Sequence, residues 1–240
     1  MNWGEFENEL LYKHIHTINN NSNENIVLFG SCHMATIGYM LNKLLHGKYN
    51  IHIILSWFFE NRGVENFDMG HINGKIHDII TKCNVFIYHM HINDYHVNAI
   101  QLPFLVNESC VKLIVPNYRL DYGVNDVSEY SKSLEILKYG IEHSSFPECK
   151  FVTDTHKDII FFNTRDHPTH YLLFLQSRFI YNKIVKNEEP ITIANYFDQE
   201  NRRYFEELKN DYVILPGKLP INAEISAITG INIDADYYDR

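Results

Sequence analysis

Residues 25–33 read Asn25-Ile-Val-Leu-Phe-Gly30-Ser31-Cys32-His33, and this stretch decides the fold class of the 240-residue chain. Its residues 26–29 are four consecutive apolar side chains, a run typical of a strand that is buried on both faces of a parallel sheet. Apolar residues then recur with the helical period of 3.6, and Gly47 stands where a helix C-cap belongs. The pattern predicts a strand, a turn at Gly30-Ser31-Cys32 and a helix over 34–46.

The turn between this strand and helix is the first candidate site. Open α/β folds bind ligands beyond the carboxyl ends of their parallel strands, and the first N–H groups and the dipole of a helix favour an anion there. A thiol in such a place should ionise more readily than an ordinary one, so Cys32 is our candidate nucleophile. Two structural alternatives stay open: Cys32 as a small buried hydrophobe, and Ser31 as the N-cap of the helix.

Length and composition favour one soluble α/β domain over residues 1–240, because no linker and no internal repeat interrupts the chain. The formal net charge of −9 argues against nucleic acid or an anionic membrane as a partner. No apolar run approaches the roughly 20 residues of a membrane span. The four cysteines are widely spaced and no signal peptide precedes them, which indicates reduced thiols in the cytoplasm.

Alternating patterns continue along the chain. We expect strands over 49–55, from 84 onwards and over 111–115, and helices over 6–18, 70–82, 127–143, 169–186 and 198–209. Such alternation of strands and helices predicts a three-layer α/β/α fold with a mainly parallel sheet.

The strand that starts at Asn84 ends in the polar string His89-Met-His91-Ile-Asn93-Asp94-Tyr-His96. Strand alternation places His89 and His91 on one face, as two metal ligands would need. The string is similar to the His-x-His-x-Asp-His signature of binuclear metallohydrolases, but its spacing differs. We therefore favour hydrogen-bonded histidines at a strand end, expect no metal, and keep a metal-dependent hydrolase as an alternative. Asn93 is a candidate oxyanion donor.

A second polar cluster, Arg165-Asp166-His167-Pro168, precedes the long late helix. Pro168 suits the first turn of that helix, because a missing N–H costs nothing there. His167 would then have the fixed placement that a general base needs, although an ordinary structural histidine is the alternative. Three basic residues are expected at the same rim and could bind phosphates, namely Lys112, Arg119 and Arg165. A surface ion pair is the alternative for Arg119.

The order and spacing of Gly30-Ser31-Cys32 and His167-Pro168 are similar to those of SGNH-type (GDSL) hydrolases. In that pattern Cys32 takes the nucleophile's position and His167 the base's. Thr164 stands where the orienting acid of these hydrolases would be, so Asp166 or Asn163 is expected to replace it.

More specifically, the chain resembles the WcbI-type polysaccharide biosynthesis family, which has a Gly-Asn-Cys-Gln turn after the first strand and a late His-Pro motif. Ser31 and His33 replace the Asn and Gln of that turn. The resemblance covers about residues 25–190 and leaves 191–240 as a C-terminal extension. It implies an SGNH/flavodoxin-like domain that binds coenzyme A and transfers an acetyl group from acetyl-CoA to a sugar in capsule or surface-glycan synthesis.

The residues expected to act follow from both lines of reasoning. The catalytic set is Cys32, His167, Asp166 and Asn93, and the residues expected to contact the cofactor are Gly30, Ser31, His33, Arg119 and Arg165. Besides the metal-dependent hydrolase, two rival functions stay open. One is a carbohydrate esterase or deacetylase on the same scaffold, and the other is a noncatalytic glycan-binding module with Trp57, Phe58 and Tyr118 as sugar platforms.

Overall fold

A computed structural model describes residues 5, 15–56, 74–89, 105–120, 126–164, 167–185, 198–208, 223–230 and 236–237. Within these residues a five-stranded sheet has the order β1-β3-β2-β4-β5. Its strands are β1 (His16–Ile18), β2 (Asn25–Gly30), β3 (Asn50–Leu55), β4 (Val85–His89) and β5 (Val111–Val115). Strands β2 to β5 are parallel, and β1 pairs antiparallel with β3 at one edge. The mainly parallel sheet predicted from the sequence is confirmed.

The strand order reverses beside β2. The chain moves from β2 to β3 on one side and then returns to β4 on the other side of β2. A reversal of this kind, as in flavodoxin-like sheets, leaves a crevice beyond the carboxyl ends of the two diverging strands. The end of β2 at Gly30 and the end of β4 at His89 therefore flank the place where a ligand of this fold class binds.

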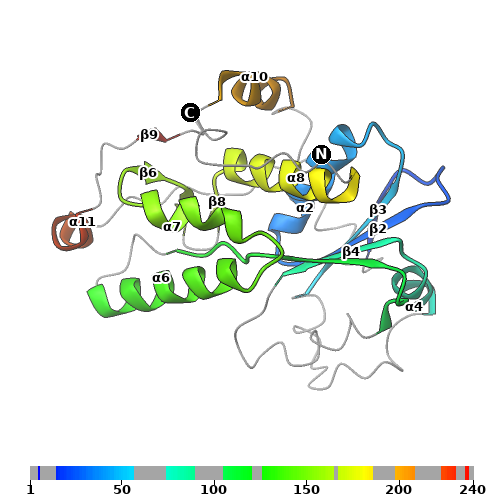
Figure 1. Cartoon of the computed structure of the whole chain (residues 1–240), viewed down its shortest axis with the longest axis horizontal. Helices are drawn as coiled ribbons and strands as arrows, with labels where there is room; N and C mark the ends of the chain where they lie inside the picture. Colours follow the sequence, from blue (N-terminus) through cyan, green and yellow to red (C-terminus); the bar gives the residue numbers. More distant parts are fainter. Residues whose placement is uncertain are drawn as a thin grey trace.

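Helices cover both faces of the sheet and complete the predicted three layers (Figure 1). Helices α2 (His33–Leu44) and α8 (His170–Val185) lie on one face, and α4 (Gly74–Thr81) lies on the other. Alternate residues of β2 divide between the two: Ile26 and Leu28 join the core with α2 and α8, whereas Val27 and Phe29 pack with α4. Burial on both faces explains the uninterrupted apolar run of this strand.

Two glycines shape α2. A Cβ on Gly38 would stand 2.7 Å from the Ile53 side chain, so the absence of one lets the helix lie close to β3. At the other end His46 and Gly47 have φ angles of 52° and 68°. Their N–H groups bond back to the carbonyls of Lys43 and Asn42, which is a Schellman ending. The helix thus ends at Leu44 with Leu45 as its C-cap, so the prediction of Gly47 as the C-cap is wrong by two residues, although Gly47 does take part in the ending.

The amino ends of the central strands are tied together by side-chain amides. Asn84 Oδ1 accepts from the backbone N–H of Asn25 at 2.7 Å, and Asn25 Oδ1 in turn accepts from the amide of Asn50 at 3.0 Å. His52 Nε2 lies 3.1 Å from the same Asn25 oxygen. These bonds fix the register of β2, β3 and β4 at the end of the sheet opposite the crevice.

The remaining described helices are α6 (Val127–Glu142), α7 (Phe151–Thr155), α10 (Gln199–Leu208) and α11 (Ala223–Thr229), with the 3₁₀ turn η4 (Pro147–Lys150) before α7. Asp126 caps α6 by accepting from the N–H of Ser128 at 2.7 Å, and this bond lowers the pKa of Asp126. The predicted helices over 127–143, 169–186 and 198–209 are confirmed. Of the described helices, not one has the length and apolar character required to cross a bilayer.

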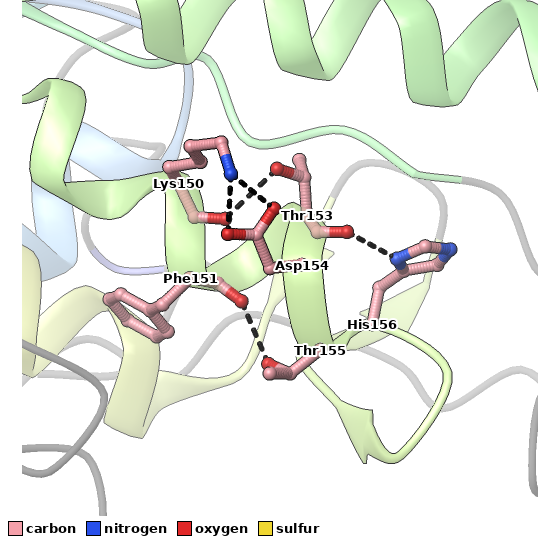
Figure 2. A network of polar contacts seen from close by, with 6 residues as sticks. All are labelled: Lys150, Phe151, Thr153, Asp154, Thr155 and His156. Atoms are coloured by element: carbon pink, nitrogen blue, oxygen red, sulfur yellow. Dashed lines mark hydrogen bonds and ion pairs between the residues drawn. The ribbon is translucent and has the colours of Figure 1, made fainter.

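Short-range hydrogen bonds close η4 and α7 into a compact unit (Figure 2). Lys150 and Asp154 form an exposed ion pair, with Nζ–Oδ distances of 2.7 and 2.8 Å. The hydroxyl of Thr153 donates to the carbonyl of Lys150, and the ring Nδ1 of His156 donates to the carbonyl of Thr153 at 2.7 Å. His156 is buried at the end of this unit, beside the ring of Tyr130.

One region differs from the sequence-based expectation, and a second carries no predicted element. The end of the predicted helix over 6–18 is strand β1, because pairing with β3 satisfies the backbone of residues 16–18. The apolar run 159–162 is divided between two small sheets outside the main one. There β6 (Ile159–Ile160) pairs with β9 (Asp236–Tyr237), and β7 (Phe162–Thr164) pairs with β8 (His167–Pro168).

The start of α8 also differs. Pro168 belongs to β8 and lies two residues before the helix, so it does not occupy the first turn. Thr169 takes the capping place: its hydroxyl accepts from the N–H of Leu172 at 3.3 Å, and its own N–H donates to the carbonyl of Phe161 at 2.7 Å. A threonine side chain can satisfy a helix N-terminus, which proline cannot do.

Candidate functional site

The predicted strand-turn-helix element is present and is built by backbone hydrogen bonds. The carbonyls of Ser31 and Cys32 accept from the N–H groups of Met34 and Ala35, each at 3.0 Å. Cys32 directly precedes the first helical residue, and its side chain does not cap the helix. The alternative of Ser31 as the N-cap is therefore wrong. The thiol stands at the start of a helix that carries no acidic residue in its first turn.

Cys32 differs from the other cysteines in exposure. It is half-buried, whereas Cys83, Cys110 and Cys149 are buried. The four residues, all within the described ranges, form no disulfide. The alternative of a small buried hydrophobe thus fits the other three cysteines better than it fits Cys32. A partly exposed thiol at a helix N-terminus is the setting in which cysteines react.

His89, the last residue of β4, contacts this turn through a hydrogen bond to Ser31. Phe29 pairs with Tyr88 in the β2–β4 ladder, which brings the next residues, Gly30 and His89, together. His89 Nδ1 accepts a hydrogen bond of 3.0 Å from the backbone N–H of Ser31. A Cβ on Gly30 would stand 2.6 Å from the same nitrogen, so only glycine leaves room for the ring.

This contact defines the tautomer of His89. A backbone N–H can only donate, so Nδ1 must carry a lone pair, and the neutral ring holds its proton on Nε2. The side chain is 1% exposed. His89 therefore presents an N–H donor on the side of the ring that faces away from Ser31.

His33 packs beside it from the first position of α2. Its ring meets that of His89 edge-to-face, with the centroids 5.4 Å apart, and it is likewise 1% exposed. The hydroxyl oxygen of Ser31 is also buried and finds no hydrogen-bond partner among the residues that the structure describes. The inner side of the turn is thus lined by two imidazoles and one hydroxyl, which sequence reasoning had not brought together.

His167, the predicted base, lies in β8 and is half-buried. From there the chain enters α8, which packs along α2 on the same face of the sheet (Figure 1). The thiol of Cys32 packs against the core that α8 contributes to. Three predicted site residues, Asn93, Arg165 and Asp166, lie outside the described residues, as do the side chains of Asn163 and Thr164.

Arg119 follows the carboxyl end of β5 and is half-buried there, which agrees with its expected place at the rim. Lys112 does not lie at the rim. It is the second residue of β5 and is exposed near the amino end of the strand, so the expectation that it meets a bound phosphate is wrong.

Tyr118 cannot serve as a sugar platform. Its side chain is 1% exposed, and its hydroxyl donates to Gln176 Oε1 at 2.7 Å in the core. Burial raises the pKa of Tyr118 well above its usual value. Trp57 and Phe58, the other two platform residues, lie outside the described residues.

Of the residues considered for a metal site, His89 is the one that the structure describes; His91, Asp94 and His96 fall outside it. Nδ1 of His89 already accepts from the backbone of Ser31. The described residues contain no group of three or more ligands that could hold a metal ion.

No family model matches the chain, and no curated protein matches it. A solved structure of WcbI, described as "a novel polysaccharide biosynthesis enzyme", is similar over 66% of this chain and 69% of its own, with a TM-score of 0.43 and 12% sequence identity. The description states that this native protein lacks a disulfide bond between CoA and one of its cysteines. Because the identity is so low, a function for the present chain must be argued from its own residues.

Proposed function

We propose that this chain is an acyl-CoA-dependent O-acyltransferase, which transfers an acetyl group to a sugar or polysaccharide precursor in the cytoplasmic synthesis of capsule or surface glycan. One observation supports this proposal above all others. Cys32 is a half-buried thiol at the start of α2, beyond the carboxyl end of β2 and beside the strand-order reversal between β2 and β4. That is where open α/β folds bind ligands and where a thiolate is stabilised.

The proposed reaction has two steps. The thiolate of Cys32 attacks the carbonyl carbon of acetyl-CoA, the bond from that carbon to the CoA sulfur breaks, and the CoA thiolate leaves with a proton from His167. A sugar hydroxyl then gives its proton to His167 and attacks the acetyl group on Cys32. The thiolate of Cys32 is released, and the ester remains on the sugar.

Both steps pass through an oxyanion that needs hydrogen-bond donors. N–H groups at the start of a helix serve this purpose in many acyl-transfer sites, and Cys32 stands at such a start. In the proposal Asn93 adds a side-chain donor and Asp166 orients His167. If Cys32 forms no acyl adduct, the same groups support direct transfer, in which His167 activates the sugar for attack on acetyl-CoA.

Coenzyme A carries several phosphate charges, while the chain has a formal net charge of −9. Binding therefore requires a local positive patch. In the proposal Arg119 and Arg165 meet the phosphates, and the turn formed by Gly30, Ser31 and His33 receives the thioester end. The absence of a Cβ on Gly30 keeps this turn close to His89.

The proposal is tested by calorimetric titration of the wild-type protein with CoA and with acetyl-CoA, followed by mass spectrometry of the acetyl-CoA mixture. We expect binding of both and an acetyl adduct whose peptide map leads to Cys32. Cys32→Ala should bind CoA but form no adduct. Cys149→Ala, which removes a buried thiol, is the matched control and should acetylate like the wild type.

Other outcomes separate the alternatives. Binding without an adduct, together with transfer to a sugar acceptor, supports direct transfer. No binding of either CoA form overturns the acyltransferase proposal. An ester-hydrolysis assay then distinguishes the carbohydrate esterase from the noncatalytic module, because only the esterase loses activity in Cys32→Ala.

A further inference from the structure

Two cysteines lie side by side at the amino ends of β4 and β5, far along the strands from the candidate site. Cys83 precedes β4 by two residues, and Cys110 directly precedes β5. Their Sγ atoms are 3.5 Å apart, and the side chains are 4% and 7% exposed. The parallel pairing of the two strands, with Val85 opposite Val111, brings the thiols together.

The backbone on both sides of the pair is fixed. The N–H of Val111 donates to the carbonyl of Asn84 at 2.9 Å, and the N–H of Cys110 donates to the carbonyl of Asn107 at 3.0 Å. A disulfide bond is about 2.0 Å long, so the two sulfur atoms need to approach by about 1.5 Å. Two side chains can share a movement of that size while the strands remain paired.

The two thiols are not equivalent. The hydrogen-bonding contact with Cys83, and to a smaller extent the charge of Lys112, lowers the pKa of Cys110 against the opposing effect of burial. The same hydrogen bond, followed by burial, raises the pKa of Cys83. Cys110 also directly follows the exposed turn 107–109 and is itself 7% exposed, against 4% for Cys83, so it is the more exposed of the two thiols. This asymmetry makes Cys110 the attacking thiol and Cys83 the resolving one.

We propose that Cys83 and Cys110 form a redox-active dithiol site that is reversibly oxidised to a disulfide by a low-molecular-weight disulfide. The thiolate of Cys110 attacks one sulfur of the small disulfide, whose S–S bond breaks, and the first small thiolate leaves and takes up a proton. The sulfur of Cys83 then loses its proton and attacks the sulfur of Cys110, and the second small thiolate leaves and takes up that proton. Two protein thiols are oxidised while one small disulfide is reduced to two small thiols.

The other cysteines do not fit this role. Cys149 is 0% exposed, its thiol lies 3.6 Å from Gln176 Oε1, and burial raises its pKa. Cys32 lies at the opposite, carboxyl end of the sheet. The dithiol site is therefore independent of the proposed acyl transfer, and either proposal can fail without the other.

The test uses the folded wild-type protein with an excess of oxidised glutathione. The remaining thiols are then blocked with iodoacetamide in denaturant, and the protein is analysed by intact mass and peptide mapping. We expect one crosslinked pair of peptides that carries Cys83 and Cys110, about 2 Da lighter than the two free peptides together because two hydrogens are removed, and protection of both residues from iodoacetamide. Dithiothreitol should reverse both changes. The midpoint of thermal unfolding should be higher for the oxidised protein than for the reduced one, because the bond closes a loop of the unfolded chain.

Two variants sharpen the result. Cys110→Ala should show no crosslink, whereas Cys149→Ala, the control at another buried cysteine, should oxidise like the wild type. The proposal is overturned if Cys83 and Cys110 both remain alkylatable after oxidation, if glutathione stays attached to Cys110, or if the crosslink involves Cys32 instead. The wild-type peptide map decides the question even where Cys110→Ala does not fold.

Discussion

The imidazole of His89 joins the carboxyl ends of β4 and β2 by accepting a 3.0 Å hydrogen bond from the backbone N–H of Ser31. The ring lies where the strand order reverses, and its partner Ser31 directly precedes Cys32, the residue at the start of α2. It therefore positions the turn that carries Cys32, and it does so as a neutral side chain, because its acceptor nitrogen cannot also hold a proton.

Removal of this acceptor should destabilise the protein. His89→Ala leaves a buried cavity and takes away the partner of the Ser31 N–H, and we expect a loss of about 2–4 kcal/mol in the free energy of unfolding, measured with urea. His89→Asn is the matched variant, because its Oδ1 can replace Nδ1 as the acceptor, and it should lose less. The rate at which iodoacetamide alkylates Cys32 in the folded protein should change in His89→Ala and stay close to wild type in His89→Asn. Equal losses of stability in the two variants would show that the hydrogen bond has no part in the effect.

Gly30→Ala should be costly for a specific reason. The new Cβ would lie 2.6 Å from Nδ1 and 2.9 Å from Cγ of His89, and 3.2 Å from Cε of Met34. We expect a loss of about 1–3 kcal/mol in unfolding free energy, as for other overpacked cores. Most of that cost should vanish when the substitution is made in the His89→Ala background, since the clashing ring is gone. If the losses of Gly30→Ala and His89→Ala are additive in this double-mutant cycle, the cost of Gly30→Ala does not come from a clash with the His89 ring.

The pH dependence of stability should report on His156 (Figure 2). Burial lowers the pKa of His156 below its ordinary value of 6.5; Lys157 and Lys138 act in the same direction, and Thr153 and Asp158 oppose them. Below that ordinary value the unfolded chain binds a proton that the folded chain resists, so stability falls as the pH falls. His156→Gln should therefore lose less unfolding free energy than the wild type between about pH 7 and about pH 5.

Urea unfolding at several pH values measures this difference. His77→Gln, which removes an exposed histidine on α4, is the matched control for the number of histidines. If His156→Gln and the wild type lose stability in parallel over this range, another group carries the dependence.

Tyr118 and Gln176 should behave as one buried unit. Tyr118→Phe deprives Gln176 Oε1 of its 2.7 Å donor and is expected to cost about 1–3 kcal/mol in urea unfolding. Gln176→Met removes the acceptor of the buried Tyr118 hydroxyl and should cost a similar amount. The double variant contains neither polar group, so its loss should be clearly smaller than the sum of the two single losses. A sum within the error of measurement would mean that the two side chains do not interact energetically.

Much of the fold could be predicted from local patterns. The central strands and the helices α2, α6 and α8 carry long, regular apolar periods, and their predicted positions agree with the structure to within a few residues. Strand β1 was missed because three residues carry too weak a period, and their state is decided by pairing with β3. The small β6–β9 and β7–β8 pairs were missed because each of these strands has only two or three residues, and the partner of β6 also lies more than 70 residues away in the sequence.

Some features of the candidate site could likewise be predicted from local sequence, and others could not. The turn at Gly30-Ser31-Cys32 and its helix were predicted because the signal lies within one short stretch. The role of His89 was not, because its position next to Ser31 depends on which strands are neighbours, and periodicity does not reveal strand order. Tyr118 was misplaced for the opposite reason. A polar aromatic residue after a strand suggests a rim position, but the hydroxyl finds its partner Gln176 inside the core.

The close approach of Gly30 to His89 has a consequence for the evolution of the chain. A larger side chain at position 30 becomes acceptable only after the imidazole at position 89 has been replaced by something smaller, so the order in which the two substitutions can occur is fixed. The sequence separation of 58 positions between Ser31 and His89 does not weaken this dependence. Among descendants of this sequence a side chain at position 30 should therefore occur only where position 89 has already changed, and a descendant with alanine at position 30 and histidine at position 89 should be rare.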